Sequence, residues 1–555
     1  MLKRKIWPLA MLVLSQNVLA VEPPNAGTQL QQIPPSPTLQ QSPPEISLVP
    51  ITADVISETD NVKINVQRIQ ITGMRAYSET DLVMQTEFKP NSELTLPELR
   101  VMAAKIADYY HKNGYFVAQA YLPAQEIKNG VISIAVIEGQ YGEIIVRNST
   151  NLSNRLVNSQ LEGINSGDVI TSEPLENRLL LLSDIAGVHI NSTLAPGAAA
   201  GTSDLIVDVT PGARVNGSID ADNGGNRYTG EHRIGATINV NNLAGQGDVF
   251  SLRALSSGEG LNYARAAYQM QLAKATVGVA YSWLNYKLGE EFKSLDASGD
   301  AKVASVYGSY PLIRSRNNNL YNDILYENKV LQDRIGATAL VTDKKIDALT
   351  AALRGDHRDQ WAGGGFNSYS VALTVGDLNI QTPTARAIDA LTARSDGQYN
   401  KLTVNASRLQ HVTDSFSLYA GLSGQLASKN LDNSEKIQLG GMYAVRAYPE
   451  GEAYGDQGYV LTLEARQNLP KFSEEMPGQL QLVGFIDTGS VTIDKTPWAA
   501  GDNTRTLSGA GVGINWVDYN NFVVKLAYAQ KLGSEDVTSA PESSGRFWVR
   551  LVKYF

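Results

Sequence analysis

Metal ligands, nucleophiles and phosphate-binding loops are the residue patterns that would first indicate chemistry in this 555-residue chain. The sequence contains five histidines: His111, His189, His232, His357 and His411. Their scattered positions show no spacing typical of metal ligands. Aspartate and serine are plentiful, but no nucleophile elbow or P-loop is present. The run Gly363-Gly364-Gly365 precedes a predicted strand rather than a helix, which favours a turn over a phosphate cradle. The sequence therefore predicts no enzyme, no cofactor and no metal site.

Composition excludes further classes. The chain has no cysteine, so it has no disulfide framework and no cysteine-based metal site. The net charge of −9 argues against a nucleic-acid binder, which normally carries a basic face. Charged residues make up 19% and aromatic residues 8% of the chain, which predicts that most of it folds.

The N-terminus predicts a secretory signal over residues 1–20. Lys3, Arg4 and Lys5 precede an apolar run from Ile6 to Leu14, and Val18-Leu19-Ala20 provides the small residues of a cleavage site. The apolar run is too short for a membrane anchor, and no later segment has the ~20 uninterrupted apolar residues of a membrane helix. The protein therefore leaves the cytoplasm, and it either stays in the periplasm or enters a membrane as a barrel.

Residues 21–60 are rich in proline, glutamine and serine. Proline removes a backbone donor and fixes φ, so we expect an extended, solvated leader. The segment 25–33 precedes most of these prolines and could form a short helix at the start of the leader.

Two successive α+β units are predicted at 61–139 and 140–212. In the first, a strand at 62–73 precedes a helix that begins at the capping box Thr95-Leu96-Pro97-Glu98 and ends at Asn113-Gly114, and strands follow at 115–122 and 130–138. The second repeats this order with a strand at 143–148, helices at 153–161 and 174–186, and strands near 188–194 and 204–210. This repeated order resembles POTRA domains.

Beyond Pro211 the helical period disappears, and short alternating segments separated by glycine, asparagine and aspartate fill residues 213–555. Sixteen strands are predicted to begin near residues 213, 230, 247, 261, 274, 301, 319, 344, 366, 398, 414, 457, 478, 505, 521 and 545. Short turns alternate with longer loops, the longest at 428–456. Periodicity alone also fits a soluble sandwich, but the even strand number, the signal and the loop alternation predict an antiparallel transmembrane β-barrel.

The last strand alternates between two faces. Phe547, Val549, Leu551 and Phe555 share one face, and a final aromatic residue of this kind resembles the outer-membrane insertion signal. Lys553 departs from this apolar face, although a lysine near the membrane interface can snorkel. The alternative is an ordinary edge strand that happens to end in phenylalanine.

Residues 439–458, most of which lie in the loop 428–456, are the most specific motif. Val445, Arg446 and Tyr448 match a Val-Arg-Gly-Tyr tip, with Ala447 in place of the usual glycine. This stretch resembles loop six of the two-partner-secretion outer-membrane transporters, which export haemolysins, filamentous haemagglutinins and contact-dependent toxins. The thirteenth strand carries a second match, Gly484-Phe485-Ile486-Asp487-Thr488-Gly489. A third, at 222–230 and 241–248, resembles the first hairpin of these transporters.

The resemblance implies that the loop tip folds back into the lumen, where Arg446 pairs with Asp487. Asp487 falls on the polar register of its strand, as does Glu464 on the twelfth strand, which could join the pair. An unpaired guanidinium in a partly dehydrated lumen is costly, so a fork to a carboxylate would fix the loop against the wall. The alternative is a solvated Arg446 and an unrelated Asp487 near a turn.

The resemblance also implies a function. Two periplasmic POTRA domains would bind an unfolded exoprotein, which would cross the barrel to the cell surface without ATP. The implied partners are this large secreted exoprotein (an adhesin, haemolysin or contact-dependent toxin), the barrel-assembly machinery during biogenesis, and outer-membrane lipid, with no nucleic acid. In relatives an N-terminal helix plugs the pore. The alternatives are a factor for barrel assembly or translocation assembly, a passive porin or receptor, and a barrel enzyme.

Overall fold

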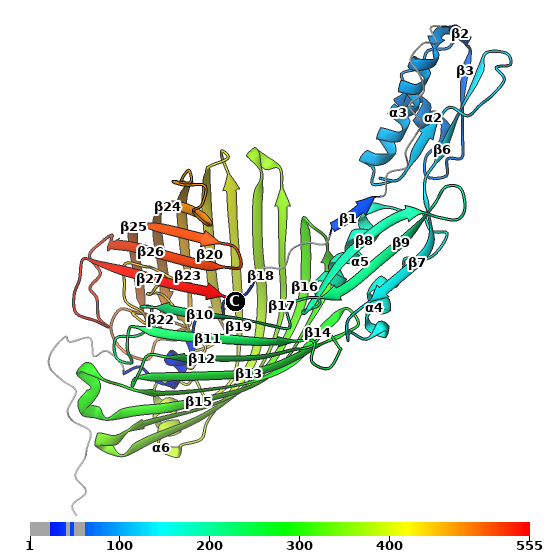
Figure 1. Ribbon diagram of the computed structural model, residues 1–555. Coiled ribbons are helices and arrows are strands. Elements are labelled where there is room, and N and C mark those ends of the chain that lie inside the picture. Colours follow the sequence, from blue (N-terminus) through cyan, green and yellow to red (C-terminus); the bar gives the residue numbers. More distant parts are fainter. Residues whose placement is uncertain (1–22, 40–44, 49–61) are drawn as a thin grey trace, which may run out of the picture.

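The computed structural model describes residues 23–39, 45–48 and 62–555 (Figure 1). The predicted signal 1–20 and parts of the leader lie outside the described residues. A large barrel carries two small α/β units at one end, and a short helix lies in its lumen. In the described ranges no helix is both long and apolar enough to cross a membrane.

The barrel is closed and has sixteen antiparallel strands, which confirms the predicted fold class. In chain order the strands are β10 (Val215–Asp222), β11 (Arg233–Asn241), β12 (Val249–Ser256), β13 (Leu261–Leu272), β14 (Ala275–Lys287), β15 (Ala297–Arg314), β16 (Asn318–Ile335), β17 (Leu340–Asp359), β18 (Gly365–Ile380), β19 (Gly397–His411), β20 (Phe416–Ala427), β23 (Gln457–Asn468), β24 (Gln479–Thr492), β25 (Thr504–Asp518), β26 (Phe522–Lys531) and β27 (Gly545–Tyr554). The last strand pairs with the first, β27 with β10, over five residue pairs.

The connections differ between the two ends of the barrel. At the end near the α/β units most turns are short, such as 273–274 and 315–317. At the opposite end lie longer loops, among them 381–396, which contains helix α6 (Pro383–Leu391), and 428–456, which contains β21 (Ile437–Gln438) and β22 (Tyr454–Gly455). Short η helices lie at Glu290–Leu295, Gly336–Thr338 and Trp361–Gly363. The run at 363–365 is thus part of a turn between strands, as predicted.

Side-chain alternation explains why this chain forms a transmembrane wall. Leu349, Leu353, Leu373 and Val375 on β17 and β18 are about half exposed and point away from the lumen. Between them, inward-facing hydroxyl groups pair across the same strands, Thr350 with Thr374 at 2.8 Å. An apolar outer face and a polar inner face are typical of strands that separate lipid from water.

The first α/β unit contains β2 (Lys63–Val66), β3 (Arg68–Thr72), α2 (Glu79–Gln85), β4 (Ser92–Thr95), α3 (Leu96–Lys112), β5 (Gln119–Tyr121) and β6 (Val131–Ile137). The prediction of one strand at 62–73 is wrong, because β2 pairs with β4 whereas β3 pairs with β6 in another sheet. The chain changes sheets at Gln67, whose backbone N–H donates to Gly130. Each short strand alternates by itself, but the phase shifts by one residue at the break, where Gln67 and Arg68 are both exposed. This shift is the signal that the prediction of one strand overlooked. The capping box at the start of α3 is confirmed, with Thr95 and Glu98 bonded to each other.

The second unit contains β7 (Gln140–Asn148), α4 (Asn154–Leu161), α5 (Ser172–Ser183), β8 (Val188–Pro196) and β9 (Thr202–Pro211). Its sheet has the order β1-β8-β9-β7 and includes β1 (Glu45–Leu48) from the leader, paired in parallel with β8. This segment of the leader is extended as predicted, but the prediction of a solvated backbone is wrong here, because β1 pairs with β8. Arg314 on the barrel rim forms a fork with Asp184 at 2.7 Å, which docks this unit on the barrel.

Candidate functional site: the loop-six latch in the lumen

Loop six, residues 428–456, folds back into the barrel. Its two arms pair through β21 and β22, and the Leu439 N–H donates to Ala453 at 2.9 Å. The Val445 N–H then donates to Leu439 at 3.0 Å, which closes the tip into a compact turn. Val445 and Tyr448 are completely buried among wall residues of β23 to β26. The tip is therefore packed like part of a protein core.

Arg446, at the tip, forms a fork with Asp487 on β24. Its Nε donates to Oδ2 at 2.7 Å, and its Nη2 donates to Oδ1 at 2.8 Å. The Arg446 backbone N–H also donates to Asp487 at 3.2 Å, and the Thr462 hydroxyl donates to it at 2.9 Å. The carboxylate is fully buried, so these donors replace the water that it loses.

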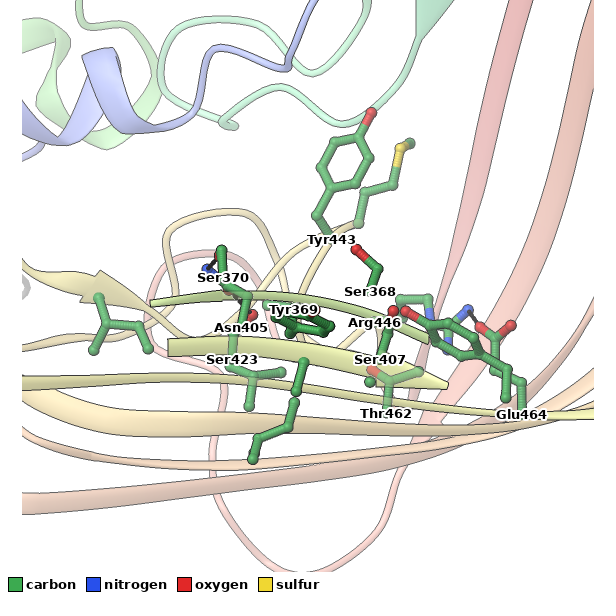
Figure 2. Close-up of a pocket in the computed structure, with 18 of the residues that line it drawn as sticks. Ser368, Tyr369, Ser370, Asn405, Ser407, Ser423, Tyr443, Arg446, Thr462 and Glu464 are labelled. Carbon is green, nitrogen blue, oxygen red and sulfur yellow. Dashed lines mark hydrogen bonds and ion pairs between the residues drawn. The ribbon is translucent and has the colours of Figure 1, made fainter. Parts of the chain in front are cut away.

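Glu464 on β23 completes the cluster that we call the latch, namely Arg446, Asp487 and Glu464. Arg446 Nη1 lies 2.9 Å from Glu464, which also binds Arg466 at 2.7 Å. Figure 2 shows Arg446 beside Glu464 in a cavity that Tyr443 of the loop also lines. Two arginines and two carboxylates thus neutralise one another in a partly dehydrated lumen, and one partner could not leave without a large electrostatic cost.

Two aromatic side chains hold Arg446 from other directions. The guanidinium carbon lies 3.4 Å from the ring centre of Phe485, a cation–π contact. The indole Nε1 of Trp548 on β27 donates to the Arg446 carbonyl at 2.7 Å. Of the residues that the sequence analysis named for this site, the structure brings together Val445, Arg446, Tyr448, Phe485, Asp487 and Glu464.

The tip also explains how Ala447 stands where the usual motif has glycine. Ala447 is not among the residues with a positive φ, and it is completely buried. It packs against Gly509 on β25, where an added Cβ would lie only 2.4 Å from the Ala447 Cβ. The space for the alanine methyl group is therefore provided by a glycine on the wall.

Phe555 lies apart from the latch, just beyond the end of β27. Its backbone exchanges hydrogen bonds with Gly217 on β10 at 2.9 and 3.1 Å, and its ring is exposed. It extends the pairing that closes the barrel. Its role as an insertion signal remains a prediction.

A second ionic cluster, which the sequence analysis missed, lies at the base of loop six. Glu435 is buried and binds Lys329 at 2.8 Å and Lys401 at 2.7 Å, while Asp432 binds Lys344 at 2.7 Å. The three lysines come from β16, β17 and β19. Lysines within membrane-spanning strands are costly unless they face the lumen, which is the signal that could have identified them.

Helix α1 (Ala26–Gln31) lies against this base and falls within the segment 25–33. Its first N–H donates to Asp333 on β16 at 2.7 Å, and Gln31 donates to the Lys436 carbonyl at 2.7 Å. Arg233 on β11 donates to the Gln32 carbonyl at 2.8 Å. The helix thus connects loop six with two parts of the wall and occupies the lumen between them.

Metal and cofactor chemistry finds no support in this arrangement. Within residues 23–39 and 62–555 no group of three or more histidine, aspartate and glutamate side chains is placed to hold a metal ion. The charged residues of the latch and of the base of loop six are paired with one another.

A closed barrel with an inward-folded sixth loop and α/β units at one end defines the class of POTRA-plus-barrel proteins of the outer membrane. The model of the POTRA domain, ShlB-type, matches residues 64–139. The model of the haemolysin secretion/activation protein family ShlB/FhaC/HecB matches residues 201–516, and the chain belongs to this family. It is an outer-membrane transporter of a two-partner secretion system, with its POTRA units in the periplasm.

The relatives extend over nearly the whole chain. The heme/hemopexin transporter protein HuxB of Haemophilus influenzae is 29% identical over 98% of this chain and 97% of its own. The outer membrane transporter CdiB of Dickeya dadantii is 23% identical over 76% of this chain and 74% of its own. Among solved structures, CdiB from Escherichia coli covers 91% of this chain and 93% of its own with a TM-score of 0.67 and 20% identity. At that identity the structural match shows the fold alone.

Proposed function

We propose that the chain exports one large, unfolded exoprotein and that the latch holds its closed state. The POTRA units (61–139 and 140–212) bind the exoprotein in the periplasm, and the exoprotein crosses the lumen as an extended chain and folds outside. No ATP is required, because folding at the surface supplies direction. The protein acts as a transporter and not as an enzyme. The fork between Arg446 and Asp487 is the observation that carries the proposal.

The lumen supports a closed resting state. Helix α1 and loop six together occupy it, and both are held by hydrogen bonds and ion pairs rather than by apolar contact alone. A polypeptide that crosses the barrel has to displace them. Breaking one partner away from a buried ion pair costs about 3–5 kcal/mol, so the latch keeps the pore closed until a client binds.

The first POTRA unit offers places for an extended client. Its sheet has the order β3-β6-β5, so β3 and β5 are its edge strands. An unfolded chain can add to such an edge as a further strand, with main-chain hydrogen bonds that do not depend on sequence. This mode of binding suits a partner that arrives unfolded.

The relatives suggest which exoprotein to test first. The curated match that covers nearly the whole chain is named a heme/hemopexin transporter protein, whereas the CdiB proteins match over a smaller share. We therefore propose an exoprotein that binds haem or haemopexin as the first candidate. A haemolysin, an adhesin or a contact-dependent toxin is the alternative, and the barrel-assembly machinery is the expected partner during biogenesis.

The test is secretion in a strain that lacks this gene, complemented with wild type, Arg446→Ala or a control variant. The control is Arg316→Ala, which removes an arginine whose ion pair with Glu176 on the periplasmic rim is partly exposed. We expect no surface exoprotein without the gene, rescue by wild type and by the control, and poor rescue by Arg446→Ala at equal barrel abundance. Normal export in the deletion strain with loss of other barrels would instead establish an assembly factor.

A further inference from the structure

Four basic side chains line a small cavity at the latch. Besides Arg446 of the latch, Arg466, Lys525 and Arg550 on β23, β26 and β27 face this space of about 150 Å³, and Glu464 lines it too. A larger cavity of about 590 Å³ shares Arg466 and Lys525 with it and runs along the wall formed by β17 to β23. Figure 2 shows part of that wall, with the polar side chains of Ser370, Asn405 and Ser423. The basic side chains therefore stand beside a larger cavity that polar and apolar side chains line together.

Two of these cations have no carboxylate partner in the described part of the chain. The Lys525 ammonium forms no hydrogen bond or ion pair with the described residues. It interacts electrostatically with the nearby arginines and with Glu464. Arg550 lies 5.6 Å from the ring centre of Tyr443 and has no ion pair among the described residues. The acid opposite Arg550 across the barrel closure, Asp222, is already bound to Arg233 at 2.8 Å. The cavity thus holds excess positive charge.

The position of these two cations argues against a purely structural role. Lys525 and Arg550 are direct partners in the antiparallel ladder of β26 and β27. Like charges directly opposite each other destabilise a sheet. A bound anion would relieve this repulsion, and a carboxylate matches the donor geometry of a guanidinium beside an ammonium.

We propose that Lys525, Arg550 and Arg466 form a binding site for acidic side chains of the exported polypeptide as it passes the latch. The proposal of this site rests on the proposed export function, and it adds that the transporter prefers an exoprotein with acidic side chains. A client carboxylate there competes with Glu464 for Arg466, a pair within β23, and draws Arg550 away from Tyr443 of loop six. Binding of the client thereby weakens the contact between Arg550 and the loop.

The test measures peptide binding to the full-length transporter in lipid nanodiscs. Fluorescence anisotropy follows a labelled Glu-Ser repeat peptide and a labelled Gly-Ser repeat peptide. We expect the acidic peptide to bind about tenfold more tightly than the neutral one, and Lys525→Gln with Arg550→Gln to remove this preference. The control is Arg354→Gln. Arg354 lines the same larger cavity but already binds Asp323 at 3.0 Å, so its loss should leave the preference intact.

Equal binding of both peptides to wild type, or an unchanged preference in the double variant, would overturn the proposal. Displacement of the peptide by free glutamate at the same carboxylate concentration would also overturn it, because the site would then take small anions. Two controls show whether each variant is folded. Its affinity for the neutral peptide should equal that of wild type, and the unheated barrel should migrate on a gel as compactly as wild type does. Export in the complementation strain is measured separately, so normal export without peptide preference refutes this site and not the proposed function.

Discussion

Replacement of Glu435 by glutamine should release the base of loop six. Glu435 is 1% exposed and neutralises Lys329 at 2.8 Å and Lys401 at 2.7 Å. Glutamine keeps the shape but removes the charge. Lys329 keeps Glu327 at 3.3 Å, whereas Lys401 is left without a carboxylate among the described residues. Loss of one side of a buried ion pair costs about 3–5 kcal/mol, which corresponds to about 100- to 4,000-fold in the balance between docked and undocked loop.

Single-channel recordings in planar lipid bilayers measure this balance, because the base of loop six and α1 together occupy the lumen. We expect the open probability of Glu435→Gln to rise at least about tenfold over wild type. The control is Asp296→Asn. The ion pair between Asp296 and Lys287 is largely exposed and should contribute at most about 1 kcal/mol to stability, so its loss should leave the open probability near that of wild type.

A further variant tests the electrostatic reason itself. If Lys329→Met and Lys401→Met are added to Glu435→Gln, neither position that faced Glu435 carries a charge any longer, and the closed state should largely return. An open probability of Glu435→Gln equal to that of wild type would refute the reasoning. So would a triple variant that stays as open as the single one.

Three further predictions concern the tip, the plug and the first POTRA unit. Gly509→Ala should displace Ala447, since the two Cβ atoms would lie 2.4 Å apart, and should reduce export severalfold; Ala447→Gly in the same chain should restore it. Gly27→Ala on α1 would place its Cβ 2.7 Å from the Ser434 backbone nitrogen and should therefore raise the open probability of the channel. An unchanged open probability would show that α1 does not block the pore. Hydrogen bonds from Thr95 lower the pKa of Glu98. The first turn of α3 should therefore be protected from amide exchange above about pH 4.5 and lose protection as the pH falls further, whereas Glu98→Gln should show no such pH dependence.

Local patterns revealed the barrel and the chemistry of the latch. Alternation with a period of two residues is a property of each strand by itself, so sixteen strands and their lumen-facing residues could be located without a partner strand. The same register placed Asp487 and Glu464 on the inner face. Arg446, the third residue of the latch, was identified because the motif around it resembles loop six of known transporters.

Contacts between distant segments could not be found in this way. The break at Gln67 shifts the alternation by one residue but does not say which strand each half pairs with. β1 in the proline-rich leader pairs with β8, which lies about 140 residues further along the chain. Neither partner carries a local signal for the other. The pairing of Ala447 with Gly509 is of the same kind, because it depends on how loop six packs against the wall.

The sequence by itself determined the strands, their inner and outer faces, the two α/β units and the residue types of the latch, because these follow from spacing within short segments. Only the tertiary structure decided that Glu435 and Asp432 meet three wall lysines and that α1 connects loop six with the wall. It also decided that Lys525 and Arg550 have no carboxylate partner among the described residues. Electrostatic pairing depends on distance in space, and closure of the barrel sets those distances.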